Sequence, residues 1–132
     1  MLERSCDMSK VLVVDDDVRG REPICRFLKA SGHEVECASD GCQALSSILD
    51  HIPDVVVLDL FMPGMDGASL LKILRSYLRL QSLPVVVLTG APDSPLVARV
   101  RSLNVHSVLT KAKATLKEIL RAVDAESQHA HN

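Results

Sequence analysis

The stretch Asp54-Val55-Val56-Val57-Leu58-Asp59, followed by Leu60-Phe61-Met62-Pro63-Gly64, decides the fold class of this chain. Its core is a continuous apolar run, which is typical of a strand covered on both faces of a sheet. The Pro-Gly pair then predicts a turn soon after the second aspartate. Similar runs occupy residues 11–14, 85–88 and, more weakly, 105–109, whereas residues 34–39 alternate in polarity like an edge strand.

Helical patterns separate these strands. Asp40, Asp66 and Ser94 are predicted N-caps, and Thr115 with Glu118 predicts a capping box. The expected helices cover residues 23–31, 41–50, 67–80 and 95–103, and a last helix runs from 115 towards 124. The order is strand–helix repeated five times. It predicts a single α/β domain in which a parallel sheet carries helices on both faces.

The composition is that of an ordinary globular chain. Of 132 residues, 47% are hydrophobic and 24% charged, and fifteen Lys and Arg against seventeen Asp and Glu give a net charge of −2. This near-balance argues against a nucleic-acid-binding surface, which needs an excess of basic residues. The aromatic residues are Phe27, Phe61 and Tyr77, too few for a base-stacking or carbohydrate-binding platform.

The cysteines and the apolar segments bear on localisation. Cys6, Cys25, Cys37 and Cys42 form no C-x-x-C pair, and the N-terminus lacks the apolar core of a secretory signal. Reduced thiols are therefore expected. No apolar run approaches the ~18 residues of a membrane span. We expect a cytoplasmic protein without membrane association.

Polar residues follow four of the five predicted strands. They are the aspartates at 15–17, Asp59, Thr89 and Lys111. In a parallel sheet these strand ends meet at one edge, where ligands bind. Crowded carboxylates either raise a pKa or recruit a cation, and oxygen ligands with open positions suit Mg²⁺. Lys111 and Thr89 could neutralise phosphoryl oxygens, with Asp59 as the nucleophile that forms an aspartyl-phosphate.

Each of these residues also has a structural interpretation. The aspartates at 15–17 suit a helix N-cap beside the helix dipole, and Asp59 suits a strand end before a turn. Thr89 is a β-former at a strand end, and Lys111 could be a solvated surface lysine. Their joint placement at four separate strand ends favours the functional interpretation.

The same residues lie in motifs that resemble the receiver domain of two-component response regulators. The matching stretches are 11–17 (VLVVDDD), 54–67 (DVVVLDLFMPGMDG), 85–90 (VVVLTG) and 108–111 (VLTK). The resemblance covers residues 9–125, between an N-terminal extension at 1–8 and a polar C-terminal tail at 126–132 that is expected to fray. It implies a CheY-like, flavodoxin-like three-layer sandwich, with one five-stranded parallel sheet in order 2-1-3-4-5 flanked by five helices.

The resemblance also implies a metal site. Asp59 corresponds to the phosphoacceptor of the family and is also a metal ligand. Asp16 corresponds to the carboxylate that binds Mg²⁺ directly, and Asp15 to its water-mediated helper. The backbone carbonyl of Phe61 would complete the site.

The residues around the phosphoryl group follow from the same resemblance. Thr89 corresponds to the switch hydroxyl, Gly90 to the small residue that leaves access to the site, and Lys111 to the lysine that pairs with phosphate. The phosphodonor in this family is a histidine kinase or a histidine phosphotransfer protein. Basic residues in the last two helices suit a solvated face or, alternatively, a downstream docking surface, which the family often places on helix 4, strand 5 and helix 5.

Three positions depart from the family pattern. Val108 replaces the usual aromatic switch residue, so the signal is expected to pass through Thr89 and residues 90–94 without an aromatic rotamer change. Ala112 replaces the proline that usually follows a cis bond, so the Lys111–Ala112 bond is expected to be trans. Pro23 lies inside the first helix, which is expected to be regular only from about residues 20–22 or to kink there.

The favoured function is a phosphorylation-dependent signalling switch, not an enzyme acting on an external substrate. The alternative is a receiver-fold interaction module that works independently of phosphorylation, for which Val108 and Ala112 speak. A Mg²⁺-dependent phosphohydrolase would need an acid or base at Phe61, and a nucleotide-binding domain would need a G-x-G-x-x-G after the first strand. Both a stand-alone receiver and a fragment of a longer regulator remain compatible with the sequence.

Overall fold

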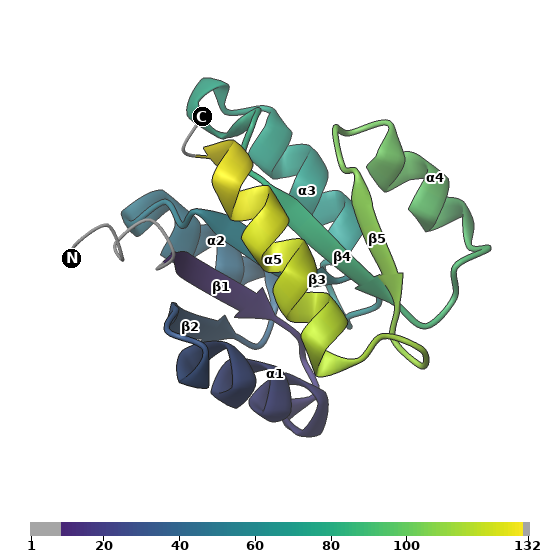
Figure 1. Cartoon of the computed structure of the whole chain (residues 1–132). Coiled ribbons are helices and arrows are strands. Elements are labelled where there is room, and N and C mark those ends of the chain that lie inside the picture. Colours follow the sequence, from purple (N-terminus) through teal and green to yellow (C-terminus); the bar gives the residue numbers. More distant parts are fainter. Residues whose placement is uncertain (1–8, 131–132) are drawn as a thin grey trace.

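The computed structural model describes residues 9–130, and the side chains of residues 9–128. The elements are β1 (Lys10–Val14), α1 (Val18–Ala30), β2 (Glu34–Ala38), α2 (Gly41–Asp50), β3 (Val55–Asp59), α3 (Gly67–Arg75), the 3₁₀ turn η2 (Leu78–Leu80), β4 (Val85–Thr89), α4 (Pro95–Arg101), β5 (Ser107–Thr110) and α5 (Leu116–Ala130). The strands pair in parallel in the order β2-β1-β3-β4-β5 (Figure 1). This topology confirms the predicted fold class.

Two apolar layers bury the two faces of the sheet. Val11 and Val13 of β1 pack with α1 and α5, whereas Leu12 and Val14 pack with α2, α3 and α4. Successive strand residues point to opposite faces, so a continuous apolar run is what a strand between two helical layers requires. α5 lies across the sheet on the α1 side (Figure 1).

All four helix starts predicted from cap residues are present as hydrogen bonds; in one of them, Asp66 Oδ1 accepts from the Ser69 amide at 2.7 Å. Asp40 Oδ1 accepts from the Gln43 amide at 2.8 Å, and Ser94 Oγ accepts from the Leu96 amide at 3.1 Å. Thr115 and Glu118 form a reciprocal capping box, with bonds of 2.9 and 3.1 Å. These caps satisfy amides that have no partner inside the helix, which explains why the helices begin where they do.

The first helix contradicts the delayed start predicted from Pro23. α1 runs from Val18 to Ala30 with Pro23 inside it. Asp17 caps the helix by accepting a 3.0 Å bond from the Arg19 amide. Pro23 is exposed, so water can solvate the Arg19 carbonyl that loses its usual partner. One lost bond on the solvent side does not outweigh the cap.

The third helix is shorter than predicted. It ends at Arg75, and residues 78–80 form the separate turn η2. The Arg75 guanidinium donates to the carbonyls of Leu80 at 2.7 Å and Leu103 at 2.8 Å, which holds the chain in a bend after the helix. Leu78 is consequently 83% exposed and lies apart from the buried face of α3.

The last strand and the last helix also differ from expectation at their ends. β5 begins at Ser107 rather than residue 105, after Asn104 with a positive φ of 64°. α5 continues to Ala130, so the tail expected to fray is helical up to that residue. Within it, the buried Ser127 hydroxyl donates to the Val123 carbonyl at 2.7 Å. The predicted N-terminal extension, residues 1–8, lies outside the described residues.

Two cysteines meet in a contact that the sequence did not predict. The structure brings the sulfur atoms of Cys25 of α1 and Cys37 of β2 together, with Cα atoms 7.3 Å apart. Their separation of twelve residues forms no recognisable motif, and they meet because α1 packs on β2. Cys42 is a free, exposed thiol, and Cys6 lies outside the described residues.

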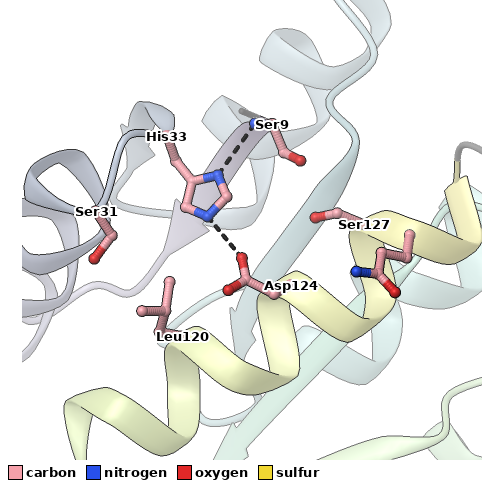
Figure 2. Close-up of a pocket in the computed structure, with 7 residues that line it drawn as sticks. Ser9, Ser31, His33, Leu120, Asp124 and Ser127 are labelled. Atoms are coloured by element: carbon pink, nitrogen blue, oxygen red, sulfur yellow. Dashed lines mark hydrogen bonds and ion pairs between the residues drawn. The ribbon is translucent and has the colours of Figure 1, made fainter. Parts of the chain in front are cut away.

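His33 ties three segments together at the amino end of the sheet (Figure 2). Its Nδ1 accepts from the Ser9 amide at 3.1 Å, and its Nε2 lies 2.8 Å from Asp124 Oδ1. The first bond requires the tautomer with the proton on Nε2, which therefore donates to Asp124. The residue is buried with both ring nitrogens paired, so its role is structural.

Among the described helices, none combines the length and the apolar content needed to cross a membrane.

Candidate functional site

Three strands deliver the polar residues to the carboxyl edge of the sheet. Asp15 follows β1, Asp59 is the last residue of β3, and Lys111 follows β5. Asp59 pairs in register with Leu88, and Thr89 of β4 pairs with Thr110. Because the strands are parallel and in register, residues far apart in sequence meet at one edge, as the sequence predicted.

The acids at this edge form one cluster. Asp15, Asp16 and Asp59 each place a carboxylate oxygen within 4.8 Å of the others. Lys111 Nζ lies 3.2 Å from Asp59 Oδ2 and 3.3 Å from Asp15 Oδ2. Three carboxylates against one ammonium leave two negative charges uncompensated. A divalent ion with a preference for oxygen ligands, such as Mg²⁺, fits this donor set.

Burial makes this excess charge costly. Asp59 is 4% exposed, and desolvation, with a further contribution from Asp15, raises its pKa from the usual 3.8 to about 6. Lys111 and the Phe61 amide lower the pKa of Asp59 but do not cancel that rise. Desolvation lowers the pKa of Lys111, yet Asp59 and Asp15 outweigh it and the net shift is upward. Lys111 is therefore a cation, and Asp59 is the acid whose ionisation is disfavoured by burial.

The loop that carries the first aspartates is held on several sides. Asp15 Oδ1 accepts from the Asp17 amide at 3.0 Å. The Asp15 amide donates to the Ala38 carbonyl of β2 at 3.1 Å, and Arg21 Nη1 donates to the Asp15 carbonyl at 2.7 Å. Asp17 points away to cap α1, so the N-cap interpretation holds for this residue.

Asp16 and Phe61 differ from the buried members of the site. Asp16 is exposed, and no hydrogen bond or ion pair to it is found among the described residues, which leaves its carboxylate available to an ion. The Phe61 amide donates to Asp59 Oδ1 at 3.2 Å. The Phe61 side chain is 44% exposed beside the site, in the loop after β3.

Thr89 lies on the neighbouring strand but is engaged elsewhere. Its buried hydroxyl accepts from the Ala91 amide at 3.0 Å. Within residues 9–128, this hydroxyl makes no hydrogen bond to the acidic cluster. A Cβ on Gly90 would meet no atom within 4 Å, so the space beside Thr89 is open. The structure thus groups Asp15, Asp16, Asp59 and Lys111, with Thr89 adjacent to them.

Two contacts of the site were not predicted. Gly67 starts α3 so close to β3 that a Cβ would lie 2.6 Å from the Asp59 carbonyl oxygen. Its place directly after the N-cap Asp66 was the available signal. Arg21 holds the Asp15 carbonyl, but one arginine among the charged residues of an amphipathic helix carries no signal in a single sequence.

The positions that depart from the family pattern are also visible. The described residues contain no cis peptide bond, which confirms the predicted trans bond between Lys111 and Ala112. Val108 is half-buried and packs against the apolar layer formed with α2, α3 and α4. The amides of Lys113 and Ala114 donate to the Thr110 carbonyl and close the chain into a turn after β5.

Residues 11–124 match the family described as the response regulator receiver domain. Response regulator MprA of Mycobacterium avium (strain 104) is 38% identical over 130 residues, which cover 89% of this chain and 55% of that protein. This chain spans between 34 and 55% of the length of its MprA relatives.

Solved structures show the same likeness. The receiver domain of Francisella response regulator 1452 aligns with a TM-score of 0.80 and 33% identity, over 92% of this chain and 98% of that one. The Vibrio cholerae chemotaxis protein CheY4 aligns with a TM-score of 0.82 and 28% identity, over 89% of this chain and 98% of that one.

Proposed function

Because this chain belongs to the response regulator receiver domain family, we propose that it is a phosphorylation-dependent switch of a two-component phosphorelay. Receiver domains are signalling proteins and not enzymes that turn over external substrates. The observation that carries the proposal is the Lys111 ammonium, which bridges Asp59 and Asp15 beside the exposed Asp16. This arrangement presents a nucleophile, a fixed cation and free oxygen ligands at one point.

Asp59 is the proposed phosphoacceptor. One of its carboxylate oxygens attacks the phosphorus of a phosphohistidine donor, a P–O bond forms and the P–N bond to the donor imidazole breaks. The nucleophile has to be ionised. With a pKa of about 6, Asp59 is mostly ionised at neutral pH even before an ion or a phosphoryl group approaches.

The acidic cluster is the proposed metal site. Asp15, Asp16, Asp59 and the Phe61 carbonyl would hold Mg²⁺, with Asp16 as the direct ligand and Asp15 acting through water. When bound, the ion neutralises charge on the phosphoryl oxygens. Asp16 is exposed and has no partner among residues 9–128, which supports the first assignment. The buried Asp15, already paired with Lys111, supports the second.

Lys111 and Thr89 complete the proposed mechanism. The ammonium pairs with a phosphoryl oxygen in place of its present contact with Asp59. The Thr89 hydroxyl leaves the Ala91 amide and turns to the phosphoryl group, which shifts residues 90–94 and the start of α4. Val108 has no aromatic ring that could change rotamer on phosphorylation, so the loop at residues 90–94 transmits the signal.

The proposal extends to the surroundings of the switch. We place the receiver domain at residues 9–125, with flanking segments at 1–8 and 126–132, in a cytoplasmic protein. Response regulators partner with histidine kinases; a kinase or a histidine phosphotransfer protein is the proposed donor. The downstream partner is a protein that docks on α4, β5 and α5, and nucleic acid is not bound directly.

Phosphorylation by a small donor tests the proposal. The chain is incubated with acetyl phosphate and Mg²⁺, and the intact mass is measured. We expect a gain of one phosphoryl group that Asp59→Asn abolishes. Asp54→Asn is the matched control, because Asp54 lies at the opposite end of β3, where it accepts from the Lys10 amide at 2.8 Å, and this variant should gain the same mass.

Two outcomes would overturn the assignment. An unchanged gain in Asp59→Asn would mean that another residue accepts the phosphoryl group. No gain with any small donor or phosphohistidine donor would favour the interaction module that works without phosphate.

A further inference from the structure

The two cysteines on α1 and β2 form a cluster that the phosphorylation chemistry does not use. Cys37 pairs in register with Val13 and shares its side of β2 with Val35, which packs against the α1 layer. Cys25 belongs to the same apolar layer. The two sulfur atoms therefore meet because helix and strand pack face to face (Figure 1).

The two thiol groups differ in accessibility. Cys37 lies on the edge strand β2 and is exposed, whereas Cys25 lies on the buried face of α1 and is 3% exposed. A small oxidant in solvent can reach the first sulfur and not the second. This asymmetry is what a reactive thiol and a buried resolving thiol require.

The backbone positions suit both an open and a closed pair. The Cα atoms are 7.3 Å apart, slightly beyond the range of about 4.4–6.8 Å that disulfides usually span. A small approach of α1 to β2 suffices to close the bond, and the reverse movement suffices to open it. Both elements also hold the Asp15 peptide group, through Arg21 and through Ala38.

We propose that Cys25 and Cys37 are a redox-responsive pair, which a hydroperoxide closes and a dithiol reopens. The Cys37 thiolate attacks the peroxide oxygen, giving a sulfenic acid and releasing hydroxide. The Cys25 thiol then attacks the Cys37 sulfur, the S–S bond forms and water leaves. Two thiols lose two electrons in all, and hydrogen peroxide becomes two waters.

The test starts from a Cys6→Ser/Cys42→Ser background, in which Cys25 and Cys37 are the remaining thiols. The protein is reduced, treated with hydrogen peroxide, alkylated and analysed by intact mass and peptide mapping. We expect the loss of two hydrogen atoms, a Cys25–Cys37 crosslink, no alkylated thiol, and full recovery of both thiols with dithiothreitol. Asp59→Asn in the same background should behave identically, because closure does not rest on phosphorylation.

Single variants separate the two roles. With Cys25→Ala, dimedone should trap a sulfenic acid on Cys37. With Cys37→Ser, Cys25 should stay reduced at the same peroxide dose, and circular dichroism should show both variants folded. The proposal is overturned if Cys25 is oxidised as fast without Cys37, if both thiols stay alkylatable at a dose that oxidises Cys42 in the parent protein, or if dithiothreitol leaves the bond closed in the folded chain.

Discussion

The two ends of the central strands treat buried polar groups in opposite ways. At the amino end, both ring nitrogens of His33 are paired, one with the Ser9 amide and one with Asp124 (Figure 2). At the carboxyl end, one lysine faces three carboxylates, and Asp59 is buried with a raised pKa. His33 finds both of its partners within the chain, whereas the carboxyl end keeps an excess of negative charge that a cation would compensate.

This difference distinguishes buried polar groups that stabilise the fold from buried polar groups that serve a function. A buried polar group with its partners in place contributes to stability, and its loss leaves those partners unpaired. A buried charge without full compensation costs stability, and is retained where an ion or substrate supplies the missing charge. Changes at the carboxyl end should therefore alter chemistry more than stability, and changes at the amino end should do the reverse.

Removal of Lys111 should have the largest effect. Lys111→Met takes away the cation that contacts both Asp15 and Asp59 and that would stabilise the transferring phosphoryl group. We expect phosphorylation by acetyl phosphate to slow by roughly 10²–10³-fold, the cost of losing one such charge-stabilising group. Initial rates from intact mass measure this. Lys113→Met, an exposed lysine two residues later, is the control, and equal rates in the two variants would contradict the assigned role of Lys111.

The charge on Asp59 should make stability depend on pH. Its pKa is higher in the folded than in the unfolded chain, so ionisation destabilises the fold as pH rises from about 4 through about 6. Asp59→Asn removes this cost. In chelator, the variant should gain up to about 3 kcal/mol over the parent at pH 7 and little at pH 4, given about 1.4 kcal/mol per pKa unit. Urea unfolding at both pH values tests this, and a pH-independent difference would be inconsistent with the raised pKa.

His33→Leu should show the opposite behaviour. It leaves the Ser9 amide and the Asp124 carboxylate without their partner, which should cost about 1–3 kcal/mol in the free energy of unfolding. Asp124→Asn should cost less, because its side-chain oxygen still accepts from Nε2. Phosphorylation rates should be unchanged in both variants. A slower rate at full stability in His33→Leu would break the separation between the two ends.

The smallest expected effect is a difference in Mg²⁺ affinity between variants of the neighbouring acids Asp15 and Asp16. Asp16→Ala should weaken Mg²⁺ binding by on the order of tenfold, about 1.4 kcal/mol. Asp15→Ala should weaken it by less, because Asp16 is proposed to bind the ion directly and Asp15 through water. Asp17→Ala is a control, since Asp17 caps α1. Calorimetric titration measures all three affinities, and equal losses in Asp15→Ala and Asp16→Ala would undo this division of roles.

The sequence predicts those features that depend on local patterns. Apolar runs identified the strands, cap residues such as Asp40 and Ser94 fixed helix starts, and polar strand ends located the site. All of these signals lie within a few residues of the element they describe. The topology of a parallel sheet then brings three of these strand ends into one cluster and places the fourth, at Thr89, beside it.

The features that were wrong or missed depend on distant contacts or on solvent. The end of α3 is set by Arg75 reaching the Leu103 carbonyl, 28 residues away in sequence. The Cys25–Cys37 contact depends on how a helix packs on an edge strand. Pro23 is tolerated because it faces solvent, which a single sequence does not reveal. Arg21 contacts the Asp15 backbone and therefore leaves no residue pattern to detect.

The carboxyl signal of Asp59 is the most informative measurement on this molecule. Its ¹³C chemical shift, assigned with Asp59→Asn, is followed against pH with and without Mg²⁺. We predict a midpoint near the value of about 6 that burial and Asp15 produce, and a clear shift to lower pH when Mg²⁺ binds beside the carboxylate. A midpoint at the ordinary value of 3.8 that does not respond to Mg²⁺ would contradict the charge imbalance and, with it, the proposed metal and phosphoryl chemistry.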